Sequence, residues 1–228
     1  MFLSVFDMFK IGIGPSSSHT MGPMVAAARF LDRLRRSAFQ PKGVSARLHG
    51  SLAFTGVGHA TDRAVILGLA GFRPDTFDAD AAEAALADIR ATRQVSPEGL
   101  GNLAFDPEQD IVFDYGPPLP GHTNGLILMA RDGEGDVIVQ DTFYSVGGGF
   151  VLTEAELAAG AAQDEGAPVP YPFKTAAEML EMCRTTGKTI AELKRANEQT
   201  RMSGEALDAG LQRIWETMKA CIDRGLEA

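Results

Sequence analysis

The feature that most constrains the fold is a pair of strand-like segments joined by a short glycine-rich turn. The segments are NGLILMARDG (124–133) and DVIVQDTFYSVGGG (136–149). The turn between them, DGEGD (132–136), contains two glycines, and such turns typically join neighbouring antiparallel strands. The sequence therefore predicts a β-hairpin over these residues.

Further strands and helices are predicted around this hairpin. GVSARLHG (43–50) alternates like a strand, and DIVFDY (110–115) is a second candidate strand. Helical patterns cover residues 4–10, 23–36, 60–69 and 81–93, the last opened by the capping pair Asp80 and Glu83. Such a mixture with a clear hairpin favours an α+β domain over a doubly wound sheet. We expect a two-layer sandwich with a mostly antiparallel sheet, followed by a helical C-terminal segment.

The composition changes after residue 153. AAGAAQDEGAPVPYP (158–172) is small, acidic and rich in proline, which is typical of a linker. Three helices are predicted beyond it from the capping residues Thr175 with Glu178, Thr189 with Glu192, and Ser203. We expect one domain over residues 1–155, a linker over 156–172, and the start of a second domain at 173–228 whose remainder is absent. A small helical subdomain folded back on the first domain would show a similar pattern.

Charge and composition exclude several classes of protein. The net charge of −9 and the short basic run RLRR (33–36) argue against nucleic-acid binding, which needs a concentrated basic face. No apolar run is long enough for a transmembrane helix, and the N-terminus carries Asp7 and no signal-peptide pattern. Cys183 and Cys221 lie far apart and indicate buried thiols. We expect a cytoplasmic protein with neither a nucleic-acid nor a membrane partner.

The segment IGIGPSSSHTMGPM (11–24) places several hydroxyl groups directly before a predicted helix. Backbone amides at a helix N-terminus, together with hydroxyls, form a natural site for a carboxylate or phosphate. Capping the helix would need only one hydroxyl, and this segment has four, on Ser16, Ser17, Ser18 and Thr20. The segment is therefore a candidate anion site.

All four histidines lie in glycine-rich or hydroxyl-rich segments. They are His19 in SSSHT, His49 in LHGS, His59 in GHATD and His122 in GHTNG. Such segments expose backbone N–H groups and allow close approach of a ligand. A single histidine is more often structural, but the recurrence makes at least two of the four functional candidates. YSVGGGF (144–150) is a further candidate, because three glycines exceed what one turn type requires.

These segments together resemble one family, the bacterial iron–sulfur L-serine dehydratases, also called L-serine deaminases or L-serine ammonia-lyases. The motifs that carry the resemblance occur in the same order: SVFDMFKIGIGPSSSHTMGPM, LHGSLAFTGVGHATD, GHTNG and YSVGGGF. The resemblance is close over residues 1 to about 155. It continues more loosely into PFKTAAEMLEMC, which resembles the start of the family's catalytic domain.

The resemblance implies a two-domain enzyme. Its N-terminal β domain would be α+β, like the allosteric substrate-binding domain of some phosphoglycerate dehydrogenases. Its C-terminal α domain would hold a [4Fe–4S] cluster, whose open iron would act as a Lewis acid on the serine hydroxyl. The reaction would be a β-elimination that converts L-serine to pyruvate and ammonia through an aminoacrylate, without pyridoxal phosphate. This chain has only two cysteines, whereas a protein-held cubane needs at least three thiolates. We therefore expect no metal ligands in this chain and place the cluster in the absent α domain.

The resemblance also implies roles for individual residues. His59 is our first candidate for general base or proton relay and His122 the second, with His19 also in play. The sequence itself does not rank the three. The candidate substrate-binding residues are Ser16, Ser17, Ser18, Thr20, Thr61, Asp62, Asn124, Ser145, Gly147, Gly148 and Gly149.

Two functions stay open at this point. The first is an L-serine ammonia-lyase in which this chain supplies the substrate side of the active site and is inactive alone. The alternative is a regulatory domain that senses serine without a catalytic role. Convergence of the three histidines on one site would favour the first.

The expected partners are L-serine, the absent α domain and a second copy in a homodimer. Serine and threonine differ by one methyl group, which a pocket distinguishes weakly, so the sequence does not decide between these two substrates.

Overall fold

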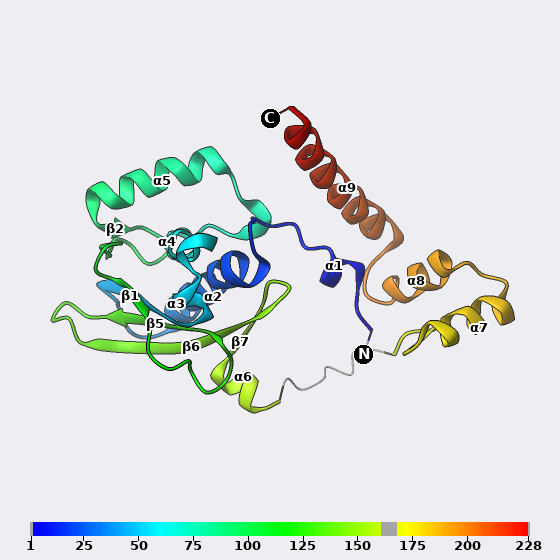
Figure 1. The fold of residues 1–228 in the computed structure, drawn as a ribbon, viewed down its shortest axis with the longest axis horizontal. Coiled ribbons are helices and arrows are strands. Elements are labelled where there is room, and N and C mark those ends of the chain that lie inside the picture. The colour runs from blue at the N-terminus through cyan, green and yellow to red at the C-terminus, as the bar shows by residue number, and fades with distance from the viewer. Residues whose placement is uncertain (1, 161–167, 228) are drawn as a thin grey trace. The chain divides into compact units, whose positions relative to one another are not determined.

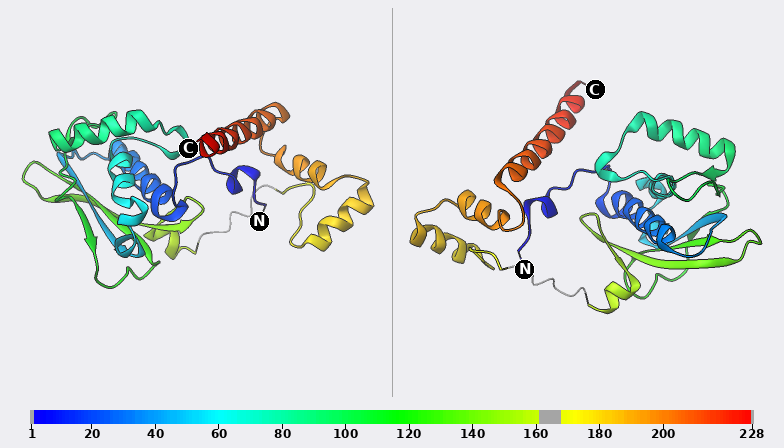
Figure 2. Two further views of the ribbon diagram at one scale, coloured as in Figure 1. Left: turned by 45° about the horizontal axis from the view of Figure 1, so that its top comes forward. Right: turned by 180° about the vertical axis from the view of Figure 1, so that it is seen from behind.

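The computed structural model describes residues 2–160 and 168–227. The chain divides into two compact units, traced in Figure 1 and Figure 2: residues 12–160 form one, and residues 2–11 join residues 168–227 in the other. This division differs from the expected boundaries at residues 2–11, which group with the C-terminal helices. The expected linker falls partly outside the described residues, and its first part belongs to helix α6 (Glu154–Ala158).

One mixed sheet forms the first unit. Its strands are β1 (Gly43–Gly50), β2 (Gln94–Val95), β3 (Leu103–Ala104), β4 (Ile111–Asp114), β5 (Asn124–Arg131), β6 (Val137–Gly147) and β7 (Phe150–Thr153). The order is β2-β3-β1-β5-β6-β7, and β4 also pairs with β1. Among the described strands, β3 and β4 run parallel to β1 and the other four pairings are antiparallel. The expected mostly antiparallel sheet is therefore confirmed.

The predicted hairpin joins β5 to β6. Arg131 pairs with Val137 at its base, and the N–H of Asp132 donates to the carbonyl of Asp136 at 3.0 Å. A register shift at Ala130 and Arg131 marks a bulge beside the turn. The turn residues thus form the antiparallel connection that their glycines favour.

Helices lie on one face of the sheet, which makes the expected α+β two-layer arrangement (Figure 1). They are α2 (Gly22–Arg36), α4 (Thr61–Leu69) and α5 (Ala79–Thr92), with the short α3 (Ser51–Phe54) directly after β1. The predicted start of α5 is wrong by two residues. Asp78, not Asp80, is the cap, and its Oδ1 accepts from the N–H of Ala81 at 2.7 Å.

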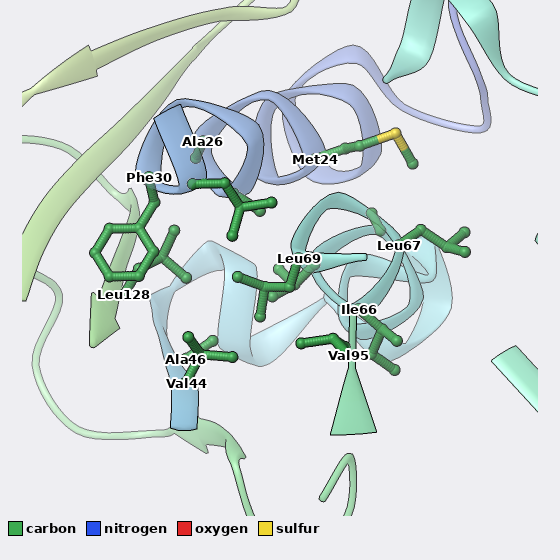
Figure 3. Packing of buried hydrophobic residues seen from close by; sticks show 14 of the residues in the cluster. Met24, Ala26, Phe30, Val44, Ala46, Ile66, Leu67, Leu69, Val95 and Leu128 are labelled. Atoms are coloured by element: carbon green, nitrogen blue, oxygen red, sulfur yellow. The ribbon is translucent and has the colours of Figure 1, made fainter. Parts of the chain in front are cut away.

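The hydrophobic core lies between this helical layer and the sheet. Figure 3 shows Phe30 of α2 beside Leu128 of β5, and Met24 of α2 beside Leu67 of α4. A Cβ at Gly68 would lie 2.7 Å from the carbonyl oxygen of Met24, so α4 passes α2 at a distance that only glycine permits. This packing holds the N-terminal ends of α2 and α4 in place, and these ends carry the site.

The second unit is helical. Its helices are α1 (Val5–Met8), α7 (Ala176–Thr186), α8 (Ile190–Glu198) and α9 (Gly204–Glu227). Both predicted capping boxes form, at Thr175 with Glu178 and at Thr189 with Glu192. Glu198 is buried and accepts from the Ser4 hydroxyl and from the N–H of Val5, each at 2.7 Å. This carboxylate therefore ties the N-terminal segment to α8.

The long helix α9 carries an exposed apolar band. The band comprises Leu211, Trp215, Met218 and Ile222, with exposed fractions between 37% and 54%. Their spacing places them along one side of the helix.

Across the described ranges, no helix combines the length and the apolarity that crossing a membrane would require.

Candidate active site

The SSSHT segment forms a π-helical turn, Ser17–Met21, that leads into α2. The Ser16 hydroxyl accepts from the backbone N–H of His19 at 3.1 Å and so caps this turn. One hydroxyl therefore has the capping role. The cap holds His19 half-buried at the entrance to α2.

Both ring nitrogens of His19 are hydrogen-bonded to hydroxyl groups. Nδ1 lies 2.9 Å from the Oγ of Ser18, and Nε2 lies 2.9 Å from the Oγ of Ser51. Ser51 is the first residue of α3, directly after β1. Because a hydroxyl can both donate and accept, either neutral tautomer of His19 is satisfied here.

His59 lies against His19. The two ring centroids are 4.7 Å apart with a tilt of 34° between the ring planes. The Nδ1 of His59 is 2.9 Å from the carbonyl oxygen of Thr55. A carbonyl only accepts, so Nδ1 carries the proton and the lone pair of neutral His59 is on Nε2. This tautomer suits a general base.

Two threonine hydroxyls bind the histidine segments to each other. Thr20 donates to the carbonyl oxygen of His59 at 2.9 Å, and Thr61 donates to that of His19 at 2.7 Å. Both threonines are buried, with exposed fractions of 2% and 0%. Their hydroxyls thus hold the histidine backbones together and do not face solvent.

His122 lies in the loop that leads into β5. Its Nδ1 accepts from the backbone N–H of Asn124 at 3.1 Å, which leaves the proton of the neutral ring on Nε2. The neighbouring carbonyl of Thr123 accepts from the N–H of Ser51 at 2.8 Å. The His122 loop is therefore attached to the residue that binds His19.

The YSVGGGF segment lies beside this loop. The side-chain amide of Asn124 donates to the carbonyl of Ser145 at 3.1 Å. The Ser145 hydroxyl is fully buried without a hydrogen-bond partner in the described structure, and a Cβ on Gly22 would lie 2.0 Å from it. Ser145 therefore packs against the start of α2, and its side chain is not exposed.

All three glycines after Val146 have positive φ. Gly148 and Gly149, at 60° and 73°, are the central residues of the turn that joins β6 to β7. Gly147, at 95°, sits at the register shift that precedes this turn. The bulge requires a positive φ at Gly147, and the type I′ turn requires one at Gly148 and Gly149, so backbone conformation explains all three glycines.

Three other residues complete the surroundings. Ser17 is exposed at the start of the π-helical turn, and Asp62 is half-buried in the first turn of α4. His49 lies on β1 with its Nε2 buried and unpartnered in the described structure. Its Nδ1 is 3.8 Å from a carboxylate oxygen of Asp114. In the described structure, His49 shares no hydrogen bond with His19 or His59.

The fold favours the uncharged form of two histidines. Burial lowers the pKa of His19 below its usual 6.5, and positive charge on His59 lowers this pKa further. Burial also lowers the pKa of His49, with Asp114 opposing the change. His19 is therefore a neutral hydrogen-bonding group near pH 7.

Exposed apolar side chains flank the polar site. The rings of Phe54 and Tyr115 pack edge to face at 5.4 Å, and their exposed fractions are 64% and 60%. Val57, which begins the turn that ends on His59, is 70% exposed. Exposed apolar side chains that gather on one surface are typical of a site that binds a ligand or another protein.

The described residues do not fit an iron–sulfur cluster. They contain no group of three histidine, cysteine or acidic side chains that could hold a metal ion. Cys183 lies half-buried on α7 and Cys221 lies exposed on α9, and both are free thiols, so the expectation of buried thiols is wrong. A cubane needs at least three thiolate ligands, and these two cysteines are too few to hold one.

Sequence reasoning missed Ser51 and Thr55, which bind the rings of His19 and His59. Both lie in the quoted segment LHGSLAFTGVGHATD. The only signal in the sequence is the Gly50–Ser51 pair at the end of a predicted strand. That pair does not indicate which histidine a hydroxyl would reach.

Comparison with known proteins gives a consistent result. An L-serine dehydratase of Streptomyces coelicolor is 42% identical over 228 residues, which cover 99% of this chain and 50% of that protein. L-serine dehydratase 1 of Escherichia coli is 40% identical over 227 residues, or 98% of this chain and 49% of the relative. The chain therefore spans about half the length of the curated relatives it matches.

The family model described as serine dehydratase beta chain matches residues 4–156. This range is more than half of the chain and contains SSSHT, GHATD, GHTNG and YSVGGGF. The same range contains the hydrogen-bonded histidine site described above. The chain belongs to the serine dehydratase beta chain family.

Proposed function

We propose that this chain supplies the substrate side of the active site of an L-serine ammonia-lyase, which converts L-serine to pyruvate and ammonia. The supporting observation is the arrangement of the histidines. The rings of His19 and His59 stack at 4.7 Å, and the His122 loop is bonded through Thr123 to Ser51, the partner of His19. A shared site is the arrangement that catalysis by these histidines requires.

The substrate carboxylate would bind at the π-helical turn. Ser17 is exposed there, and the backbone N–H groups at the start of a helix favour an anion. Ser16 and Ser18 orient this turn through their bonds to His19. Thr20 and Thr61 hold the two histidine segments together from below the surface. Asn124 and the turn at Gly147–Gly149 would form the adjoining wall.

The hydrogen bonds give two histidines different roles. Thr55 holds His59 with the lone pair on Nε2, which fits removal of the Cα proton. The N–H of Asn124 holds His122 with the proton on Nε2, which fits a hydrogen bond donated to the leaving oxygen. His19, neutral and bonded at both nitrogens, would support His59 by packing against it.

The proposed reaction is an elimination followed by hydrolysis. His59 takes the Cα proton of L-serine, the Cα–Cβ double bond forms, and the Cβ–O bond breaks. The oxygen leaves as hydroxide while it accepts a hydrogen bond from the Nε2–H of His122, and a proton from solvent converts it to water. The 2-aminoacrylate formed rearranges to 2-iminopropanoate, and addition of water releases ammonia and leaves pyruvate. His59 then returns its proton to solvent.

The iron–sulfur cluster that the resemblance implies would belong to the part of the enzyme outside this chain. We propose that this part docks on the exposed residues Phe54, Val57 and Tyr115 beside the histidines. A homodimer remains a proposal as well, supported by the exposed apolar band on α9. The activity is therefore proposed for the longer protein and not for the chain alone.

The test is pyruvate release from L-serine, measured anaerobically with iron and sulfide supplied. The chain alone would be compared with the chain extended to the full length of its relatives. We expect activity only in the extended form, and its loss in His59→Ala and His122→Ala with cluster absorbance retained. Serine binding to the short chain without activity in the extended form would support a sensing domain and refute the lyase.

A further inference from the structure

We propose that Ser51 is the positioning residue that sets the three histidine segments relative to one another. This inference rests on the proposed function only for its catalytic consequence. Its structural basis is that three polar groups of Ser51 are each hydrogen-bonded to a different part of the site. No other described residue at the site is linked in this way, directly or through one neighbour, to all three histidine segments.

The side chain of Ser51 holds the His19 ring. Its Oγ lies 2.9 Å from Nε2, on the side opposite the Ser18 hydroxyl. Without Ser51, Nε2 would lose its partner while Nδ1 kept Ser18. The ring would then be held at one nitrogen only, and its stacking on His59 would loosen.

The backbone of Ser51 connects the other two segments. Its N–H donates to the carbonyl of Thr123, the residue after His122, at 2.8 Å. Its carbonyl oxygen accepts from the N–H of Thr55 at 3.0 Å and from the Thr55 hydroxyl at 2.8 Å. The carbonyl of Thr55 in turn accepts from the Nδ1 of His59. Ser51 is thus hydrogen-bonded directly to His19, and it is linked to His59 through Thr55 and to the His122 loop through Thr123.

Gly50 fixes the direction of this residue. Its φ of 55° and ψ of −129° turn the chain sharply between β1 and α3, in a region that favours glycine. A Cβ at this position would lie 2.3 Å from the carbonyl oxygen of Thr123. The close approach brings the Ser51 N–H to that carbonyl and leaves its hydroxyl directed at His19.

The decisive experiment follows the histidine rings directly by ¹⁵N–¹H spectroscopy of the 228-residue chain. Ser51→Ala is expected to change the Nδ1 and Nε2 shifts of His19 and to alter its tautomer balance. Ser51→Thr, which keeps the hydroxyl, is expected to restore both. Ser45→Ala is the matched control, since Ser45 is a buried serine on β1 whose hydroxyl is bonded to Arg131 and not to His19. We expect it to leave the His19 shifts unchanged.

The kinetic arm uses the extended protein. Loss of one hydrogen bond predicts a decrease of about three- to tenfold in kcat for Ser51→Ala, with KM little changed and recovery in Ser51→Thr. Unchanged His19 shifts and unchanged kcat in Ser51→Ala would refute the positioning role. If wild type released no pyruvate, the lyase proposal would fail, while the ring shifts would still decide the role of Ser51. Ser51→Cys, of similar size, serves if the alanine variant does not fold.

Discussion

His19 and His49 are the two histidines whose pKa burial lowers below the usual 6.5. The unfolded chain therefore binds protons at these positions at a higher pH than the folded chain does. Their contribution to stability is fully present above about pH 6.5 and is lost as the pH falls toward the folded pKa values. We expect the free energy of unfolding to decrease between pH 7.5 and pH 5.5, a range in which carboxyl groups stay mostly ionised.

Urea unfolding at the two pH values measures this difference. His19→Gln and His49→Gln are each expected to reduce the pH dependence, whatever they do to stability at pH 7.5. Ser96→Ala, at an exposed position, is the control and is expected to keep the full dependence. Equal unfolding free energies at both pH values in the wild type would contradict the prediction.

Some residues of the histidine site could be predicted from the sequence, and others could not. The SSSHT, GHATD and GHTNG segments were recognisable because hydroxyls and glycines cluster around histidine in each. The partners Ser51 and Thr55 were not recognisable, because a ring hydrogen bond depends on the turn at Gly50 and not on spacing along the chain. The tautomers of His59 and His122, on which the proposed choice of base rests, likewise depend on which backbone group each Nδ1 meets.

At the scale of elements, local patterns predicted the type of structure better than its pairing. The hairpin between β5 and β6 follows from its turn residues. The parallel pairing of β1 with β4 does not, because it joins segments far apart in sequence. The start of α5 was misplaced since Asp78 and Asp80 are both good caps, and only the bond from Ala81 to Asp78 selects between them.

The contact between α2 and α4 depends on one small residue. A Cβ at Gly68 would lie 2.7 Å from both the Met24 carbonyl oxygen and the Cβ of Ala27. Neither neighbour is the flexible end of a side chain, so the helices would have to separate. We expect Gly68→Ala to destabilise the protein by about 1–3 kcal/mol, as overpacking of a core typically does.

Thermal and urea unfolding test this prediction against Gly225→Ala. A Cβ at Gly225, on α9, would meet no atom within 4 Å. There alanine only adds helix propensity, worth up to about 1 kcal/mol in favour of the helix. Opposite signs for the two substitutions are expected. A Gly68→Ala protein as stable as wild type would show that the α2–α4 contact is not tight.

At the scale of the whole molecule, the chain crosses between its two units more than once. The sequence indicated a change of character after residue 153 and predicted the capped helices α7 and α8 correctly. It did not indicate that residues 2–11 belong with those helices. The reason is that the ties are tertiary contacts of individual side chains, such as Glu198 with Ser4 and Lys194 with the carbonyl of Leu3. Nothing in the sequence distinguishes the buried Glu198 from an exposed glutamate.

Glu198 is therefore the residue with which the grouping of the N-terminal segment can be tested. Its carboxylate accepts from the Ser4 hydroxyl and the Val5 N–H at 2.7 Å, and its exposed fraction is 3%. Hydrogen bonds to a charged group contribute about 1.5–3 kcal/mol, and removing the acceptor leaves buried donors unpaired. We expect Glu198→Ala to destabilise the helical unit by about 2 kcal/mol and to expose residues 4–8 to amide exchange and proteolysis.

The unit of residues 12–160 should keep its protection from amide exchange in this variant. Glu205→Ala is the control, because Glu205 is exposed, and both units should keep their protection in it. Loss of protection in β1 and β5 after Glu198→Ala would mean that the N-terminal segment supports the sheet, contrary to the division of the chain into these two units.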